Sequence, residues 1–252
     1  MPSLSVVIIT LNEEKNIARC LESLQGIADD IVVVDSGSTD RTEEICTSFG
    51  VRFFQKEWMG YSEQKNYANT LAAHDWIFSI DADESLSELL RQSILKIKAN
   101  EGPDNYRICR LTNYCGKWVR HSGWYPDLKV RFFDRTQTKW EGHIHERLTV
   151  GDEKAIPVLE GDCYHYSYYT LEQHKKQADA FSSLSAEDLF ARGKKVGAFK
   201  RGFAPLFKFF KIHILQAGFL DGSAGLDIAR ISAHAVYLKY RKLKNLYAQR
   251  PI

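Results

Sequence analysis

Strand and helix signals alternate along the first hundred residues, and this alternation constrains the fold more than any other feature of the sequence. Four short apolar runs predict strands, over Ser5–Thr10, Ile31–Val34, Val51–Phe54 and Trp76–Ile80, and the first two are typical of buried strands. The segments between them predict helices, over Asn16–Leu24, after a cap at Thr39 or Asp40, and over Ser62–Leu71. The order βαβαβαβ indicates an α/β fold, a mostly parallel central sheet with helices on both faces.

The pattern changes beyond about residue 105. Further strands are predicted at Tyr106–Leu111, at Lys129–Phe133 and near Cys163–Tyr166, followed by helices over Leu171–Arg192 and Ile228–Tyr247. We therefore expect an α/β domain over residues 1–170 and a basic, helical C-terminal region over residues 171–252.

Composition excludes several classes of protein. The 252 residues are 44% hydrophobic and 26% charged, which is ordinary for a globular chain and unlike a disordered or fibrous one. The sequence has no run of eighteen apolar residues and no signal-peptide pattern at its start. Its five cysteines contain no C-x-x-C pair, which favours reduced thiols in the cytoplasm.

Charge is divided unequally along the chain. Residues 1–105 contain 9 Lys+Arg and 18 Asp+Glu, whereas residues 106–252 contain 25 Lys+Arg and 14 Asp+Glu. An acidic half suits a metal-bound ligand, and a basic half suits phosphates or an anionic membrane surface. The alternative is that the helices simply carry unequal solvated charge.

A phenylalanine-rich stretch, residues 194–215, separates the two long C-terminal helices. Pro205 is expected in the first turn of a helix that carries Phe207, Phe209 and Phe210 among interleaved lysines. This pattern favours a helix lying in a membrane interface, and the alternative is a helix packed on the domain. The recurring lysines argue against a membrane span.

Polar side chains follow three of the predicted parallel strands, in Thr10–Glu14, Asp35–Asp40 and Asp81–Asp83. Ligands bind at the carboxyl edge of such sheets. Asp81 and Asp83 could offer oxygens to Mg²⁺ or Mn²⁺ and, through it, to a diphosphate, although an acidic pair alone is a weak signal. The glycine-rich dinucleotide and P-loop signatures are absent, which argues against nicotinamide chemistry and P-loop phosphoryl transfer.

Four segments together resemble glycosyltransferase family 2, whose members have a GT-A fold. They read SVVIITLNEEKNIARCLESL, DDIVVVDSGSTDRT, GYSEQKNYA and WIFSIDADE, within residues 4–84. The remainder resembles the narrower lipopolysaccharide inner-core β-glucosyltransferase branch, in GWYPDLKVRFF, WEGHIHERL, HYSYYTLEQHKKQADAFS and GFLDGSAGL. The resemblance implies a GT-A-type nucleotide-sugar-binding domain.

The resemblance also implies roles for individual residues. Thr10, Asn12 and Glu14 match the first nucleotide-contacting loop, and Asp35 matches the residue that contacts the nucleoside. Lys65 matches a basic position near the nucleotide. Asp83 matches the direct metal ligand, and Asp81 matches a residue that contacts ribose or the metal shell. For Lys65 the alternative is a solvated helix lysine.

The implied reaction is an inverting transfer of glucose from UDP-glucose to a heptose of the lipopolysaccharide inner core. A cation stabilises the departing diphosphate, and a base removes the acceptor proton. Glu146 is our first candidate for this base, Asp127 the second and Glu141 the third. For Glu146 the alternative is a surface ion pair with Arg147.

Acceptor-side residues follow from the same loops. Trp124 is expected to line an acceptor pocket, and His145 to orient the base, while His143 or His165 could complete the metal or diphosphate shell. The expected partners are a UDP-sugar donor, a lipid-anchored saccharide acceptor and an anionic membrane surface, with no nucleic acid. The enzyme is expected to be cytoplasmic, peripheral on the inner face of the cytoplasmic membrane.

Three alternatives stay open at this point. The same mechanism could use another UDP-sugar for capsule or exopolysaccharide synthesis. A nucleotidyltransferase can share a related fold, but a Gly- and Arg-rich phosphate loop is missing after the first strand. A non-catalytic binding module is disfavoured by the intact Asp81 and Asp83 pair.

Overall fold

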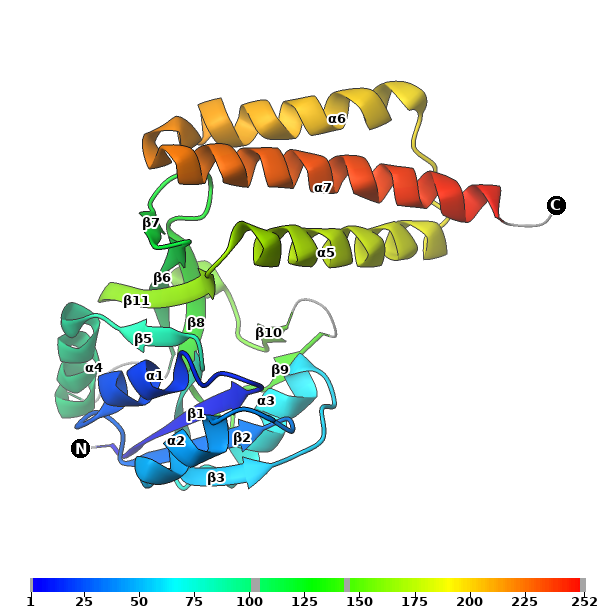
Figure 1. Cartoon of the computed structure of the whole chain (residues 1–252). Helices are drawn as coiled ribbons and strands as arrows, with labels where there is room; N and C mark the ends of the chain where they lie inside the picture. Colours follow the sequence, from blue (N-terminus) through cyan, green and yellow to red (C-terminus); the bar gives the residue numbers. More distant parts are fainter. Residues whose placement is uncertain (1, 101–104, 143–145, 250–252) are drawn as a thin grey trace. The chain divides into compact units, whose positions relative to one another are not determined.

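The computed structural model describes residues 2–100, 105–142 and 146–249, and the chain divides into two compact units. The first unit holds the residues up to Arg110 together with Asp127–Tyr166, and the second holds Leu111–Pro126 with the residues from Ser167 on. Figure 1 labels the elements of both units. The segment Leu111–Pro126, which our division at residue 170 assigned to the first domain, belongs to the second unit.

One sheet organises the first unit. Its strands are β1 (Leu4–Thr10), β2 (Asp30–Asp35), β3 (Arg52–Gln55), β4 (Trp76–Asp81), β5 (Glu84–Leu86), β6 (Tyr106–Tyr114), β8 (Asp127–Asp134) and β11 (Val158–Tyr168). They follow the order β3-β2-β1-β4-β8-β6-β11-β5. β1 pairs in parallel with β2 and β4, β2 pairs in parallel with β3, and β8 is antiparallel to β4 and β6. A separate ribbon joins β9 (Trp140–Glu141) to β10 (Arg147–Leu148), and a 3₁₀ turn, η1, spans Glu153–Ala155.

Helices cover both faces of this sheet. They are α1 (Ile17–Leu24), α2 (Thr42–Ser48), α3 (Tyr61–Leu71) and α4 (Glu88–Asn100). Successive side chains of a strand point to opposite faces, so Leu4, Val6 and Ile8 pack with α1, α2 and α4, whereas Val7 packs with α3. The expected α/β fold, with a mostly parallel run of strands at its start, is confirmed.

Helices dominate the second unit. They are α5 (Leu171–Ala191), α6 (Ala198–Phe210) and α7 (Ser223–Ala248), with a π-helical turn η2 (Lys211–Leu215) and a 3₁₀ turn η3 (Gly218–Asp221) before α7, and strand β7 (Lys117–Val119) pairs with the end of β6. A capping box between Thr170 and Gln173 starts α5. Lys242 on α7 joins α5 through Asp179, at 2.7 Å. The expected C-terminal helical region is confirmed.

Pro205 lies inside α6 and not in its first turn, so that prediction was wrong. The helix begins seven residues earlier, at Ala198, and runs through Pro205 to Phe210. Proline has no N–H to donate and costs stability in a helix interior, which is why the sequence pattern predicts the start of the helix there. α6 packs along α7, and Pro205 lines the groove between the two helices.

Membrane spanning can be judged from helix length and hydropathy. Within the described ranges, no helix is both long enough and apolar enough to cross a bilayer.

His174 on α5 is buried in an aromatic cluster of the second unit. Its Nδ1 lies 2.8 Å from the Tyr114 hydroxyl, and the rings of Trp124 and Tyr168 lie 5.8 Å and 4.7 Å from the His174 ring. Burial lowers the pKa of His174 to about 4, against a small opposing effect of Asp227. The imidazole is therefore neutral in the folded protein at neutral pH.

This depressed pKa predicts a loss of stability in mild acid. Between pH 6.5 and 4 the unfolded chain binds a proton at His174 that the folded chain does not, so stability is complete above pH 6.5 and decreases toward pH 4. The loss should reach at most about 3.4 kcal/mol. Denaturant titrations across this range should show a shallower pH slope for His174→Asn, which keeps an acceptor for Tyr114. Equal slopes in both proteins would contradict the prediction.

Candidate functional site

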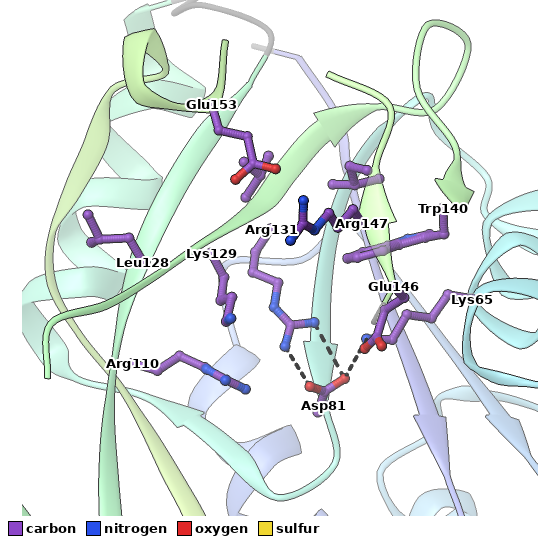
Figure 2. Close-up of a pocket in the computed structure, with 12 residues that line it drawn as sticks. Lys65, Asp81, Arg110, Leu128, Lys129, Arg131, Trp140, Glu146, Arg147 and Glu153 are labelled. Carbon is purple, nitrogen blue, oxygen red and sulfur yellow. Dashed lines mark hydrogen bonds and ion pairs between the residues drawn. The ribbon is translucent and has the colours of Figure 1, made fainter. Parts of the chain in front are cut away.

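A pocket of about 510 Å³ opens beside the carboxyl end of β4, within the first unit. Figure 2 shows its lining, which comes from α3, β4, β6, β8, β9 and β10. The lining side chains are Lys65, Asp81, Arg110, Leu128, Lys129, Val130, Arg131, Trp140, Glu146, Arg147, Leu148 and Glu153. Cationic side chains prevail over carboxylates in this lining, so the pocket suits an anionic ligand.

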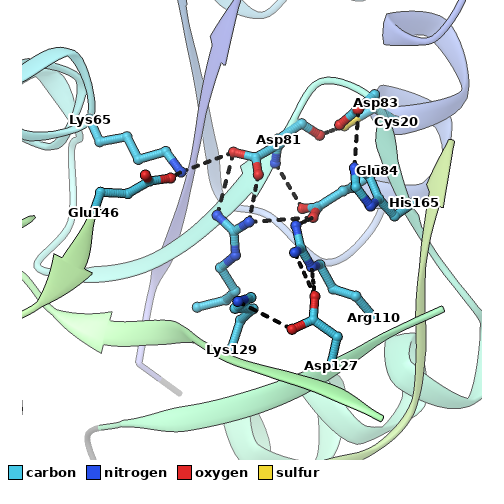
Figure 3. A network of polar contacts seen from close by, with 11 residues as sticks. Cys20, Lys65, Asp81, Asp83, Glu84, Arg110, Asp127, Lys129, Glu146 and His165 are labelled. Atoms are coloured by element: carbon cyan, nitrogen blue, oxygen red, sulfur yellow. Dashed lines mark hydrogen bonds and ion pairs between the residues drawn. The ribbon is translucent and has the colours of Figure 1, made fainter. Parts of the chain in front are cut away.

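Asp81, the last residue of β4, faces two cations across the pocket floor. Its Oδ1 lies 3.1 Å from Lys65 Nζ, and its Oδ2 lies 2.5 Å from a guanidinium nitrogen of Arg131. Burial alone would raise the pKa of the Asp81 carboxyl, but Arg131 and Lys65 hold that pKa well below its usual range. Asp81 is therefore an anion that the protein itself neutralises (Figure 3).

A buried ionic network continues from Asp81 into the sheet. Arg131 on β8 also contacts Glu84 at 3.3 Å, and Arg110 on β6 contacts the same carboxylate at 3.1 Å. The other Glu84 oxygen accepts a hydrogen bond from the Asp81 amide. Burial would lower the pKa of Arg131, but Asp81 and Glu84 outweigh it and raise that pKa, so the guanidinium stays charged.

Lys65 on α3 is 4% exposed, so the alternative of a solvated lysine is wrong. Its ammonium lies between the carboxylates of Asp81 and Glu146, at 3.1 Å and 3.4 Å, and 4.7 Å from the Trp140 ring centre. Glu146 therefore pairs with Lys65 inside the pocket. Lys65 thus links Asp81 at the end of β4 to Glu146.

Asp127, our second candidate base, forms ion pairs with two cations. Its Oδ2 accepts two hydrogen bonds from Arg110, at 2.8 Å and 2.5 Å, and its Oδ1 lies 3.2 Å from Lys129. Burial raises the pKa of this carboxyl, but Arg110 and Lys129 together lower it below its usual range. A carboxylate held in this way is a weak proton acceptor.

Asp83 faces His165 on β11, with 3.3 Å between Oδ2 and Nε2. Burial would lower the pKa of His165, but the hydrogen bond and charge of Asp83 raise it. Nearby, burial raises the pKa of Glu13 to about 6, against a hydrogen bond from Asn16, and Asp83 adds to the rise. Negative charge is thus concentrated around Asp83.

The loops after β1 and β2 are fastened to each other. Asn12 adopts a left-handed conformation, with φ of 55°; its amide donates to Ser38 and its side-chain oxygen accepts from the Thr39 amide. Glu14 accepts a hydrogen bond from the Arg41 amide at 3.2 Å.

Asp35 and Thr10 are buried side chains at the start of these loops. Asp35 accepts from the amides of Gly37 and Ser38, at 2.9 Å and 2.7 Å, so it shapes the second loop. The hydroxyl of Thr10 is buried without a hydrogen-bond partner. A donor or acceptor from a ligand could satisfy it.

Trp124 and Glu141 are not among the residues that line this pocket. Trp124 belongs to the second unit, in the cluster around His174. His145, like His143, lies outside the described residues. Glu141, the third candidate base, is exposed and pairs with Lys139 at 3.0 Å.

Sequence reasoning missed two arginines and a glutamate near Asp81. Arg110 and Arg131 each lie among apolar residues inside a predicted strand, and an arginine that is buried in such a strand is normally paired. Glu84 directly follows Asp83 and is fully buried. Its partners come from strands far away in the sequence, which a local pattern could not identify.

The donor atoms around Asp83 can be tested against a divalent cation. Among the described residues, no three His, Cys, Asp or Glu side chains gather as a metal cage. Asp83 and His165 offer one carboxylate and one imidazole, and His165 Nδ1 is buried without a partner. This incomplete set fits a cation such as Mg²⁺ or Mn²⁺ that takes its other ligands from water and a bound diphosphate.

Comparison with known proteins gives matches along most of the chain. A family model described as Glycosyl transferase family 2 matches residues 5–157. An uncharacterized glycosyltransferase from Rickettsia typhi is 33% identical over 259 residues, covering 98% of this chain and 88% of that protein. The lipopolysaccharide core biosynthesis glycosyltransferase LpsC from Rhizobium meliloti is 27% identical over 252 residues. The alignment covers 94% of this chain and 93% of that protein.

Solved structures match more partially. A glucosyl-3-phosphoglycerate synthase from Mycobacterium tuberculosis, in complex with Mn²⁺, UDP and glucosyl-3-phosphoglycerate, has a TM-score of 0.36 at 26% identity. The match covers 45% of this chain and 44% of that chain.

Proposed function

The chain belongs to glycosyl transferase family 2, and from this premise we propose that it is an inverting enzyme that uses a UDP-sugar. Glycosyl transfer is the activity of the family; the donor, the acceptor and the stereochemistry are the proposal. The observation that carries it is the pocket in which Asp81, Lys65 and Glu146 meet at the carboxyl edge of the sheet. Ligands of open α/β sheets bind at this edge.

The proposed donor is UDP-glucose, and the proposed acceptor is a heptose of the lipopolysaccharide inner core. The relative from Rhizobium meliloti, whose name assigns it to lipopolysaccharide core biosynthesis, supports this choice because it aligns along 94% of the chain. The sugars themselves follow from the resemblance of the C-terminal segments. Another UDP-sugar for capsule or exopolysaccharide synthesis is the alternative.

In this proposal the loops after β1 and β2 hold the nucleoside. Asn12 and Asp35 fix the two loops, and the unpartnered Thr10 hydroxyl lies at the same strand ends. Arg131, Lys65 and Arg110 would then attract the diphosphate. Because these cations are already held by carboxylates, they need little rearrangement when the donor binds.

A divalent cation would be held by Asp83 and His165. When bound, Mg²⁺ or Mn²⁺ supplies Lewis acidity for the departing diphosphate. The concentration of negative charge around Asp83 supports this assignment, since Glu13, Asp81 and Glu84 all lie near it. Asp81 stays with Arg131 and Lys65 and orients the donor.

We assign the acceptor-side base to Glu146. It lines the pocket, and Lys65 holds one of its oxygens at 3.4 Å, which leaves the other to face an acceptor hydroxyl. Asp127 is the weaker candidate because Arg110 and Lys129 lower its pKa. Glu146 would take the proton as the hydroxyl attacks the anomeric carbon from the face opposite the diphosphate.

Glu146→Gln tests this assignment. The amide keeps the shape of the side chain but cannot accept the proton, so transfer should fall about 100- to 10,000-fold. Stabilisation by UDP with Mn²⁺ in a thermal-shift assay should persist. Asp127→Asn is the matched control and should lose much less transfer. A full rate in Glu146→Gln, with a large loss in Asp127→Asn, would reverse the two roles.

The helical unit is the part proposed to meet the membrane. Its basic residues Lys200, Lys208 and Lys211 lie on α6 and η2 and would attract an anionic surface. The lipid-anchored acceptor would then be presented at that surface. This places the enzyme, in the proposal, on the cytoplasmic face of the inner membrane.

A further inference from the structure

A groove of about 740 Å³ runs between α6 and α7, within the second unit. It is lined by Arg201, Gly202, Pro205, Leu206, Phe209, Arg230, Ala233, His234, Tyr237, Tyr240, Arg241 and Lys244. No aspartate or glutamate is among these lining residues. The groove therefore combines an apolar floor with the cations of Arg201, Arg230, Arg241 and Lys244.

Helical spacing produces this lining. On α6, Arg201, Pro205 and Phe209 follow each other every four residues, so they share one face of the helix. On α7, Tyr237, Arg241 and Lys244 are spaced by four and then three residues and also share a face. The two helices run in opposite directions (Figure 1).

Positive charge is gathered at one end of the groove. Arg201 and Lys244 line a neighbouring cavity of about 310 Å³ as well, together with Lys195. This end therefore joins the beginning of α6 to the later turns of α7.

The four cations of the groove have no carboxylate partner among the described residues. Two other cations of this unit are paired on the helix surface: Lys242 contacts Asp179 at 2.7 Å, and Arg192 contacts Asp188 at 2.9 Å. Unpaired like charges beside apolar surface favour binding of an anion.

An exposed aromatic row lies on α6 beside these residues. Phe199, Phe203 and Phe207 stack along the helix, with ring centres 5.7 Å and 6.1 Å apart, and Phe199 is 83% exposed. Leu206, which is 69% exposed, neighbours Phe207 in the chain and lines the groove. Apolar side chains exposed in this number mark an interaction site, and basic residues beside them favour a lipid surface over a protein.

We propose that the groove binds one molecule of an anionic phospholipid. Its phosphate lies at the end formed by Arg201, Arg241 and Lys244, and its glycerol and upper acyl chains lie along Pro205 and Phe209. The lipid is the occupant that matches both halves of the lining, since free phosphate would leave the apolar floor uncovered. This inference builds on the proposed membrane contact, and it adds a defined lipid site to general surface attraction.

The test uses the full chain and short-chain lipids below their micelle concentration. Wild type should bind dihexanoylphosphatidylglycerol saturably, and bind dihexanoylphosphatidylcholine and glycerol 3-phosphate at least about tenfold more weakly. Arg241→Gln/Lys244→Gln should lose at least about tenfold in affinity. Lys96→Gln/Lys176→Gln removes the same charge elsewhere and should bind as wild type does. Equal losses in both double variants would overturn the proposal.

Two further measurements test whether the groove itself holds the lipid. Ala233→Phe fills the groove and leaves every charge in place, so this variant should also lose lipid binding. If Ala233→Phe does not fold, the result for Arg241→Gln/Lys244→Gln decides the question. Glycerol 3-phosphate binding as tightly as the lipid would overturn the lipid assignment. Transfer to a water-soluble acceptor should be unchanged in the glutamine pair, and its absence from wild type would refute the proposed function while leaving the lipid result standing.

Discussion

Replacing Asp83 by alanine is expected to reduce sugar transfer about a thousandfold, the equivalent of about 4 kcal/mol of transition-state stabilisation. The change removes the carboxylate that faces His165 at 3.3 Å and, with it, the proposed anionic ligand of the cation. UDP should then no longer raise the melting temperature in the presence of Mn²⁺. Transfer assays and thermal shifts on the same preparations measure both effects.

Asp188→Ala is the matched control for this variant. It removes a carboxylate from an exposed pair with Arg192 on α5 and should leave transfer and nucleotide binding unchanged. Circular dichroism should show that both variants are folded. Retention of the Mn²⁺-dependent response to UDP in Asp83→Ala would mean that the cation is held elsewhere.

Arg131→Ala is expected to lower the free energy of unfolding by about 3–5 kcal/mol, a large fraction of the stability of a typical domain. Arg131 is buried between Asp81, at 2.5 Å, and the fully buried Glu84, at 3.3 Å. Without Arg131, Glu84 keeps its ion pair with Arg110, and Asp81 keeps its ion pair with Lys65. Denaturant titration measures the loss.

The control for Arg131 is Arg41, whose pair with Glu44 lies on the surface. Arg41→Ala should cause no measurable change, because exposed ion pairs contribute little. The double variant Arg131→Ala/Asp81→Asn should recover part of the loss, since it removes the carboxylate left without its arginine. A loss in Arg131→Ala no larger than that in Arg41→Ala would contradict a structural role for the network.

The longer strands and three of the helices of the first unit could be predicted from local patterns, whereas the short strands β5, β9 and β10 were missed. β1, β2 and β4 are continuous apolar runs, and the structure has them within one or two residues of the expected bounds. Helix α4 was missed, although Leu90 and Ile94 repeat every four residues and the Ser87 hydroxyl accepts from the Leu90 amide. That amphipathic pattern is present in the sequence, but it begins directly after the acidic residues Asp81–Glu84 and was not recognised as a separate helix.

The candidate site could be predicted only in part. Asp81 and Lys65 were identified because their motifs are local, and the structure brings them to 3.1 Å. Arg110, Arg131 and Glu84 depend on antiparallel pairings between β4, β8 and β6, which connect residues tens of positions apart. Sequence periodicity shows which side chains of a strand share a face, but it does not show which strand lies beside it. These contacts could therefore not be inferred.

The second unit is assembled from two separated stretches of the chain, and this has a consequence for protein synthesis. Tyr114 and Val119 leave the ribosome early, whereas Ile228 and Ala229, which cover them, follow about a hundred residues later. At the usual rate of translation this interval is roughly 5 to 20 s. During that time β7 can pair with β6 and Tyr114 can pack on Trp124, but the α7 side of this cluster is still missing. The apolar cluster around Tyr114 and Val119 is therefore completed only when α7, the last helix of the described chain, has been made.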